Sequence, residues 1–178
     1  MTKVLVAYAS KYNSTAEIAQ AIGRTLQEFQ PLEVEVRSVE LVEDITSYDA
    51  VVLGSAVYAG QWLSSAADFL TNYEQTLSQR PVWLFSSGPT SERDTKTMTK
   101  EWTFPEALTA VAERIKPRDI VVFQGKLDLS SLNFFERYIS RLVKATRGDF
   151  RDWDMIRNWS VGIAEALKAL ELQPIQHV

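Results

Sequence analysis

The stretch VLVAYASKYNST, residues 4–15, decides the fold. Its first half, Val4 to Ala9, is a continuous apolar run, which is typical of a strand buried on both faces of a sheet. The polar loop Ser10 to Asn13 follows, and Ser14 with Glu17 then matches the sequence of a capping box at a helix start. A buried strand that turns directly into a helix is the first half of a β-α-β unit, so the stretch predicts an α/β protein.

The same alternation of strand and helix repeats along the chain. Further β-rich or apolar runs cover 34–39, 50–53, 82–85 and 120–123, and helical patterns cover 65–73, 105–115, 132–144 and 153–170. Residues 34–36 alternate between apolar and charged, as an edge strand does, which favours the strand order 2-1-3-4-5. We therefore expect one domain over residues 1–178: a doubly wound, five-stranded parallel sheet with helices on both faces and an extra helix after the fifth strand.

Composition excludes several kinds of chemistry. The 178 residues include no cysteine and a single histidine, His177, next to the C-terminus. Thiolate catalysis, zinc-thiolate sites and Ser-His-Asp triads are therefore excluded, and the seven glycines form neither a dinucleotide-binding fingerprint nor a Walker A loop. If the protein is an enzyme, carboxylates or a bound cofactor must supply its chemistry.

Charge and hydropathy bound the partners and the location. The net charge of −4 argues against general binding of nucleic acid. The first strand begins directly after Lys3, which leaves no room for a signal peptide, and no apolar run approaches the length of about 20 residues that spans a bilayer. We therefore expect a soluble, cytoplasmic protein.

A doubly wound sheet binds its ligands beyond the carboxyl ends of the strands, at the point where the strand order reverses. That point lies between the first and third strands, where three loops converge. These loops are Ser10–Thr15, Gly54–Trp62 and Ser86–Thr90.

The first loop has the residues of a phosphate site. Ser10, Asn13, Ser14 and Thr15 offer polar side chains where a helix begins and leaves its first N–H groups free. Asn13 also tolerates a positive φ, which a loop folding back around a phosphate requires. The alternative is that Ser14 only caps the helix and that the other residues are ordinary polar loop.

The second and third loops have residues suited to a planar ring. Tyr58 and Trp62 flank Gly60, and a flat aromatic side chain at a switch point can stack on a ring such as an isoalloxazine, with Trp62 favoured for its size. The small residues Ser86 to Gly88 let backbone amides approach the polar edge of such a ring. Alternatively, the two aromatic side chains cover the sheet edge and 86–88 is a simple turn.

The segment Tyr8–Thr15, followed by Ala19 and Ile22, resembles the signature with which flavodoxins bind the phosphate of FMN. It departs from that signature at Ala7, where a bulkier apolar residue is expected, and at Asn13, where glycine is common. The resemblance implies non-covalently bound FMN, whose flavin carries out the electron transfer without a catalytic side chain. It implies these FMN-binding residues: Ser10, Lys11, Tyr12, Asn13, Ser14, Thr15, Ala56, Val57, Tyr58, Gly60, Trp62, Ser86, Ser87 and Gly88.

Within that family, the chain is most similar to the menaquinone-dependent protoporphyrinogen dehydrogenases. The similarity lies in Val51–Ala56 with Gly60 and Ser64, in Gly125–Lys144, and in Gly148-Asp149 leading into Trp153. This branch implies an enzyme that dehydrogenates a porphyrinogen and passes the electrons to a quinone. The alternative is an electron-carrier flavodoxin, which shuttles electrons between redox-protein partners through an acidic docking face.

A basic, aromatic segment follows the fifth predicted strand. Residues 136–151 hold five bases against two acids, a local charge of +3, and apolar residues of 132–144 recur beside them at helical spacing. Such a helix, with Arg147 and Arg151 beyond it, could meet a quinone, the carboxylates of a porphyrin or an anionic membrane surface from the cytoplasmic side. The alternative is an ordinary amphipathic helix that packs on the sheet.

Overall fold

The computed structural model describes residues 1–88, 104–127 and 148–171, and its main sheet confirms the predicted topology. The parallel strands follow the order β2-β1-β3-β5-β6, which is the predicted order 2-1-3-4-5. Their bounds are β1 Thr2–Ala9, β2 Leu32–Ser38, β3 Ala50–Tyr58, β5 Val82–Gly88 and β6 Asp119–Gln124. Two strand pairings were not predicted: the short β4 (Gln61–Trp62) antiparallel to β3, and a ribbon in which β7 (Lys126–Leu127) pairs with β8 (Gly148–Asp149).

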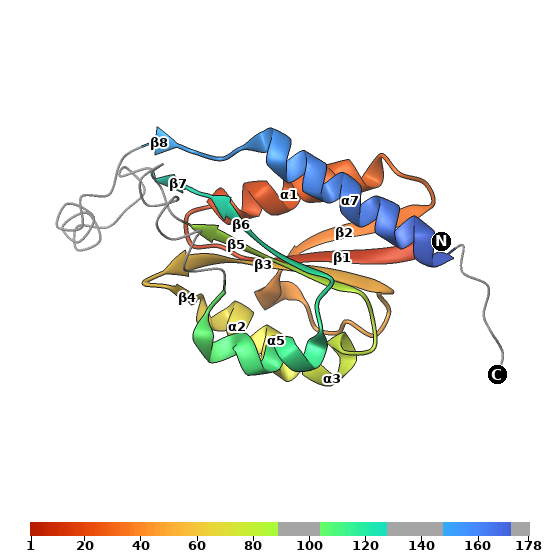
Figure 1. Cartoon of the computed structure of the whole chain (residues 1–178), viewed down its shortest axis with the longest axis horizontal. Helices are drawn as coiled ribbons and strands as arrows, with labels where there is room; N and C mark the ends of the chain where they lie inside the picture. Colours follow the sequence, from red (N-terminus) through yellow and green to blue (C-terminus); the bar gives the residue numbers. More distant parts are fainter. Residues whose placement is uncertain (89–103, 128–147, 172–178) are drawn as a thin grey trace.

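Helices cover both faces of this sheet, as Figure 1 shows. On one face lie α1 (Ser14–Gln27) and α7 (Trp153–Glu171), and on the other lie α2 (Ser64–Asn72), α3 (Glu74–Leu77) and α5 (Thr109–Ile115). Single 3-10 turns, η1 (Val39–Leu41) and η2 (Glu106–Leu108), precede β3 and α5. The helices predicted at 65–73, 105–115 and 153–170 are thus present, whereas the predicted helix 132–144 and loop 90–103 lie outside the described residues.

The continuous apolar runs follow from this two-sided covering. Val4 and Val6 of β1 pack with α1 and α7, while Leu5 and Ala7 pack in the opposite core, and all four are fully buried. Alternate side chains of a strand point to opposite faces, so both kinds of position must be apolar when both faces are covered.

One glycine allows the two central strands to pack. A Cβ atom on Gly54 of β3 would lie 2.0 Å from the Phe85 ring of β5, which occupies the space above it. Glycine at this position therefore makes room for a buried aromatic ring close to the carboxyl ends of the strands.

The edge strand β2 holds a group of charged side chains. Glu35 accepts hydrogen bonds from the Tyr48 hydroxyl at 2.8 Å and from Arg37 Nε at 2.9 Å, and its other oxygen lies 3.1 Å from Lys3 Nζ. These hydrogen bonds, that from Tyr48 above all, lower the pKa of Glu35 to about 2. The group joins β1 and the edge strand β2 to the chain segment that leads into β3.

This lowered pKa predicts a pH-dependent contribution to stability. Folded Glu35 binds its proton only near pH 2, whereas an unfolded glutamate binds it near pH 4.5, so the contribution is complete above that range and is lost as the pH falls through it. We expect Glu35→Gln to lower the free energy of unfolding at pH 6, and the difference from the parent protein to shrink towards pH 2.5. Urea unfolding of both proteins measures this; a difference independent of pH would contradict it.

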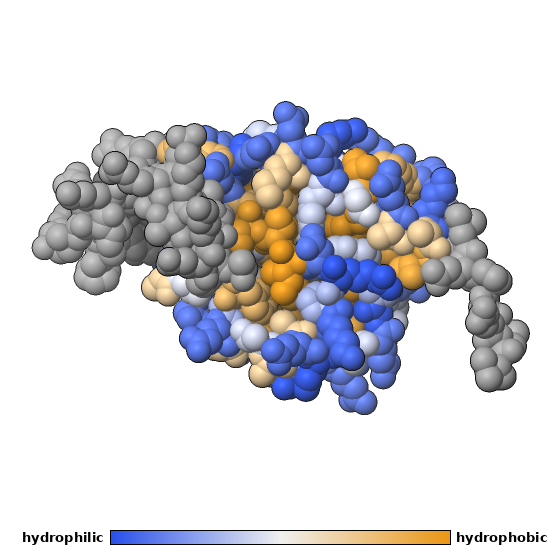
Figure 2. Space-filling view, in the orientation of Figure 1, coloured by the Kyte–Doolittle hydropathy of each residue, from blue (hydrophilic) through white to orange (hydrophobic). Residues whose placement is uncertain are grey.

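The opposite edge strand, β6, has three partly exposed apolar residues, Ile120, Val121 and Val122. Figure 2 shows an apolar band across the middle of the molecule, bordered by hydrophilic helix surfaces. Within the described ranges, no helix is both long and apolar enough to cross a membrane.

Candidate functional site

The first loop joins β1 to α1 through a left-handed residue. Asn13 has φ of 62°, the region that asparagine tolerates better than most residues, as expected from the sequence. The Ser14 N–H donates to the Tyr12 carbonyl and the Glu17 N–H to the Asn13 carbonyl, each at 2.9 Å. The N–H groups of Thr15 and Ala16 in the first turn therefore have no intrahelical acceptor and can face an anion.

The predicted capping box is wrong. Asn13 is the N-cap residue and makes no side-chain capping bond, and Ser14 is already the first residue of the helix. The Ser14 hydroxyl instead accepts the backbone N–H of Lys126 at 3.1 Å, and the Glu17 carboxylate pairs with Arg151 at 2.5 Å. The two side chains that matched the capping motif thus connect α1 to the β7–β8 ribbon.

The second loop is shorter than predicted, because β3 continues to Tyr58 and a tight hairpin leads into β4. Ala59 and Gly60 occupy the turn with φ of 49° and 74°, the two positive values of a type I′ hairpin. Ala56 and Val57 consequently lie within a strand, and Ala56 is buried. The hairpin leaves the Tyr58 side chain at the surface, 44% exposed.

Trp62 lies in the core, which reverses the order of the two aromatic candidates. It is 6% exposed, its indole N–H donates to the Ser86 hydroxyl at 2.8 Å, and its ring meets Phe104 edge-on at 5.1 Å. A ring enclosed in this way has no free face for a ligand. Tyr58 is therefore the better candidate for stacking, and Trp62 supports the hairpin that presents it.

The described part of the third segment, Ser86 to Gly88, is the end of a strand, and Pro89 and Thr90 lie outside the described residues. Ser86 and Ser87 are buried residues of β5, and Gly88 is its last residue. A Cβ atom on Gly88 would lie 3.2 Å from Cβ of Val57, and one on Gly125 would lie 3.1 Å from the Gly88 carbonyl oxygen. The small residues predicted here therefore allow close approach of neighbouring chain segments.

The parallel register brings the three segments to one edge of the sheet. Ala9 pairs with Ser55 and Ser55 with Ser86, so β1, β3 and β5 reach the same level. Lys11 connects the first two segments, because its ammonium lies 5.4 Å from the Tyr12 ring centroid and 5.9 Å from that of Tyr58. The site thus combines hydroxyl donors, a lysine and a surface tyrosine within a short distance.

Sequence reasoning missed the role of the β7–β8 ribbon. Arg151, which the sequence placed among the bases that could meet a quinone or a membrane surface, has a side chain only 3% exposed and bonds to both Glu17 and Asp149. The hydrogen bond from Arg151 lowers the pKa of the Asp149 carboxyl. The spacing of two residues between Asp149 and Arg151 could have indicated their ion pair. The second partner of Arg151, Glu17, lies far away in the sequence, and no sequence pattern pairs Glu17 with Arg151.

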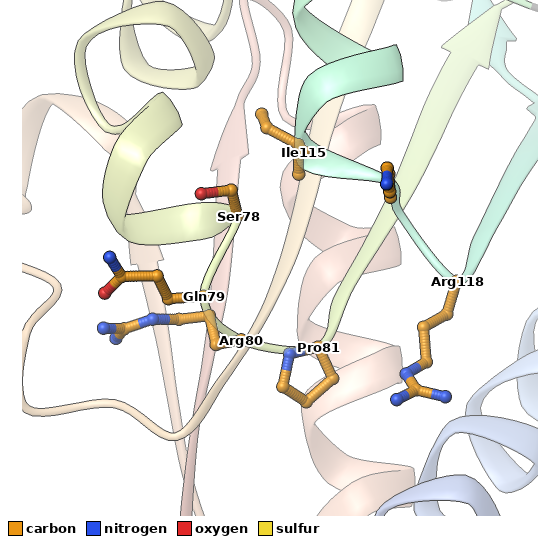
Figure 3. Close-up of a pocket in the computed structure, with 7 residues that line it drawn as sticks. Ser78, Gln79, Arg80, Pro81, Ile115 and Arg118 are labelled. Carbon is orange, nitrogen blue, oxygen red and sulfur yellow. The ribbon is translucent and has the colours of Figure 1, made fainter.

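The pocket shown in Figure 3 lies at the opposite edge of the sheet, where β5 and β6 begin. Arg80, Lys116 and Arg118 supply its charge, but Figure 3 shows the side chains of Arg80 and Arg118 extending separately, on either side of Pro81. Two Arg80 nitrogens also donate to backbone carbonyls, including that of Ile45 at 2.6 Å. The described ranges contain no group of acidic or histidine side chains suited to a metal ion.

The residues at the carboxyl edge fit a flavin nucleotide. Hydroxyl groups and free backbone N–H groups at a helix start suit a phosphate, and a surface tyrosine beside small residues suits a flat ring. The fold and this site define a class: doubly wound α/β domains that bind a mononucleotide at the switch point between β1 and β3.

Within that class, a flavodoxin-domain family model matches residues 5–154, and the chain belongs to the flavodoxin family. It is 20% identical over 173 residues to "Protoporphyrinogen IX dehydrogenase [quinone]" of Escherichia coli (strain K12), covering 91% of this chain and 94% of that protein. The protein of the same name from Leishmania major is 23% identical, with coverage of 97% and 79%.

Solved structures agree on the fold. An archaeal flavodoxin aligns with a TM-score of 0.61 at 16% identity, covering 94% of this chain and 99% of its own. Oxidised flavodoxin 2 of Bacillus cereus aligns with a TM-score of 0.60 at 23% identity, covering 93% and 99%. Each alignment spans nearly the whole length of the flavodoxin concerned.

Proposed function

We propose that this protein is an FMN-dependent oxidoreductase. The observation that carries the proposal is the first loop, in which a left-handed Asn13 folds the chain so that the start of α1 and its hydroxyl groups face the carboxyl edge of the sheet. Membership of the flavodoxin family supports the same cofactor. When bound, the flavin supplies the electron transfer, which fits a chain with no cysteine and a single histidine near its end.

Each part of the site has a role in holding FMN. Ser10, Ser14 and Thr15 donate to the phosphate, and Lys11 adds a positive charge beside them. Tyr58 packs against the ring, because it is the exposed aromatic residue of the β3–β4 hairpin. Small residues at the end of β5 leave space for the polar edge of the ring.

A porphyrinogen is the proposed substrate and a quinone the proposed acceptor. The names of the relatives from Escherichia coli and Leishmania major support this choice, and they match over most of this chain. The reaction balances simply: each pair of hydrogen atoms removed from the porphyrinogen reduces one quinone to its quinol. The predicted contact of 132–144 with a quinone or a membrane surface stays a prediction, because these residues lie outside the described ranges.

Anaerobic turnover tests the proposal. We expect the purified protein to release FMN and not FAD on denaturation, and the FMN-loaded protein to convert protoporphyrinogen to fluorescent porphyrin only when a menaquinone analogue is supplied. Release of FMN without turnover, together with rapid electron exchange with a redox protein, would favour the electron-carrier alternative. Release of no flavin after reconstitution with FMN would contradict both functions.

A further inference from the structure

A buried guanidinium joins the β7–β8 ribbon to the first turn of α1. Arg151 Nη1 lies 2.5 Å from the Glu17 carboxylate, while Nε and Nη2 reach the two oxygens of Asp149 at 2.8 and 2.6 Å. The Arg151 side chain is 3% exposed, whereas those of Glu17 and Asp149 are 45% and 41% exposed. Trp153 covers the guanidinium, whose central carbon lies 4.5 Å from its ring centroid.

The same ribbon also touches the first loop directly. The Lys126 N–H donates to the Ser14 hydroxyl at 3.1 Å, and Arg151 Nη1 lies 3.5 Å from the Ser14 carbonyl. The Phe150 N–H closes the base of the ribbon by donating to the Gly125 carbonyl at 3.2 Å. The start of α1 is therefore held from the ribbon side by a backbone donor and a side-chain cation.

We propose that Arg151 is a positioning residue for the phosphate-binding loop, and that docking of the β7–β8 ribbon and binding of the FMN phosphate reinforce each other. The inference rests on the proposed function, because it concerns the phosphate of the proposed cofactor. It assigns to a residue outside the three site segments a role in choosing phosphorylated flavin over riboflavin.

Two physical effects support this role. Glu17 lies in the first turn of α1, where its negative charge competes with a phosphate for the positive end of the helix, and Arg151 neutralises it at close range. The Ser14 hydroxyl oxygen accepts a hydrogen bond from the backbone N–H of Lys126, which leaves its own O–H free to donate to an anion. Loss of the ribbon contact would therefore leave Glu17 to repel the phosphate, and the Ser14 hydroxyl would no longer be held in one orientation.

The test compares Arg151→Met with Arg157→Met. Like Arg151, Arg157 of α7 binds a carboxylate near α1: its two Nη atoms donate to the oxygens of Glu28 at 3.0 and 2.8 Å. This pair is half-exposed, however, and lies at the other end of α1. We expect Arg151→Met to lower FMN affinity at least tenfold and riboflavin affinity less than twofold, and Arg157→Met to change neither. Adding Glu17→Gln to Arg151→Met is expected to recover part of the FMN affinity, which a merely structural role would not produce.

Hydrogen exchange of the flavin-free protein provides a readout that needs no cofactor. We expect the Lys126 amide to exchange about tenfold faster in Arg151→Met than in the parent or in Arg157→Met. The Glu17 and Asp149 carboxylates are solvent-accessible, so Arg151→Met leaves no buried charge and should fold. If Arg151→Met does not fold, Arg151→Lys is used in its place, and we expect an intermediate effect from it.

Three results would overturn the inference: equal weakening of FMN and riboflavin, no recovery with Glu17→Gln, or unchanged exchange at Lys126. Failure of the parent protein to bind FMN is a separate outcome, because it defeats the proposed function. In that case the exchange measurement alone still decides whether Arg151 holds the ribbon on the loop.

Discussion

Replacing Ser10 and Thr15 together with alanine is expected to weaken FMN binding by about 100-fold and to leave riboflavin binding within about twofold. A hydrogen bond to a charged group contributes roughly 1.5–3 kcal/mol, so loss of two such bonds at the lower value removes about 3 kcal/mol. Both hydroxyls flank the start of α1, and Thr15 is almost completely buried there. Riboflavin has the same ring without the phosphate, so it does not use these donors.

The matched control is the double variant Thr71→Ala with Ser78→Ala. These two hydroxyls donate only to local carbonyls, those of Ala67 and Gln75, on α2 and after α3. We expect the control to bind both flavins as the parent does. Calorimetric titration of both ligands into each protein gives the four affinities, and a similar loss for FMN and riboflavin would show that the loop does not hold the phosphate.

The sheet was predictable from sequence because its physical cause is local. A strand that is covered on both faces must be apolar at every position, and Val4 to Ala9 shows this without any tertiary information. The edge position of β2 was equally visible, since Val34 and Val36 alternate with charged residues. Asn13 is a similar case, because few other side chains accept a positive φ so readily.

The errors concern contacts between segments distant in the sequence. Ser14 and Glu17 match a capping box, yet their side chains bond to Lys126 and Arg151, more than a hundred residues away. Local propensity favoured the cap, and tertiary contacts supplied competing partners. No pattern along a single sequence states which acid a distant arginine will meet, so the ribbon's attachment to the loop could not be predicted.

Side-chain size was a poor guide to which aromatic residue faces a ligand. The larger size of Trp62 favours it over Tyr58 as the stacking residue, but large side chains are also the most effective core residues. The two-residue hairpin decides between them, because neighbouring positions on its strands point to opposite faces. Trp62 therefore points inwards to Ser86 and Phe104, and Tyr58 is left at the surface.

The buried Trp62 and the exposed Tyr58 predict a large and a small loss of stability, respectively, when each is replaced by alanine. Trp62→Ala is expected to lower the free energy of unfolding by about 3–5 kcal/mol, the usual range for a buried tryptophan, because it leaves a cavity and removes the donor to Ser86. Tyr58→Ala should change that free energy by less than about 1 kcal/mol, since its side chain is largely exposed. Urea unfolding of the flavin-free proteins measures both values.

Flavin affinity should show the reverse order where the protein remains folded. We expect Tyr58→Ala to weaken FMN and riboflavin equally, by about fivefold or more, because the two ligands share the ring that an aromatic side chain contacts. Tyr58→Phe keeps the ring and should bind both flavins as the parent does, while Trp62→Phe should keep flavin affinity and lose only part of the stability. Two results together would assign the stacking role to Trp62: a stable Trp62→Ala protein with weakened flavin binding, and a Tyr58→Ala protein that binds flavin normally. Only a Trp62 ring that leaves the core on flavin binding could combine those results.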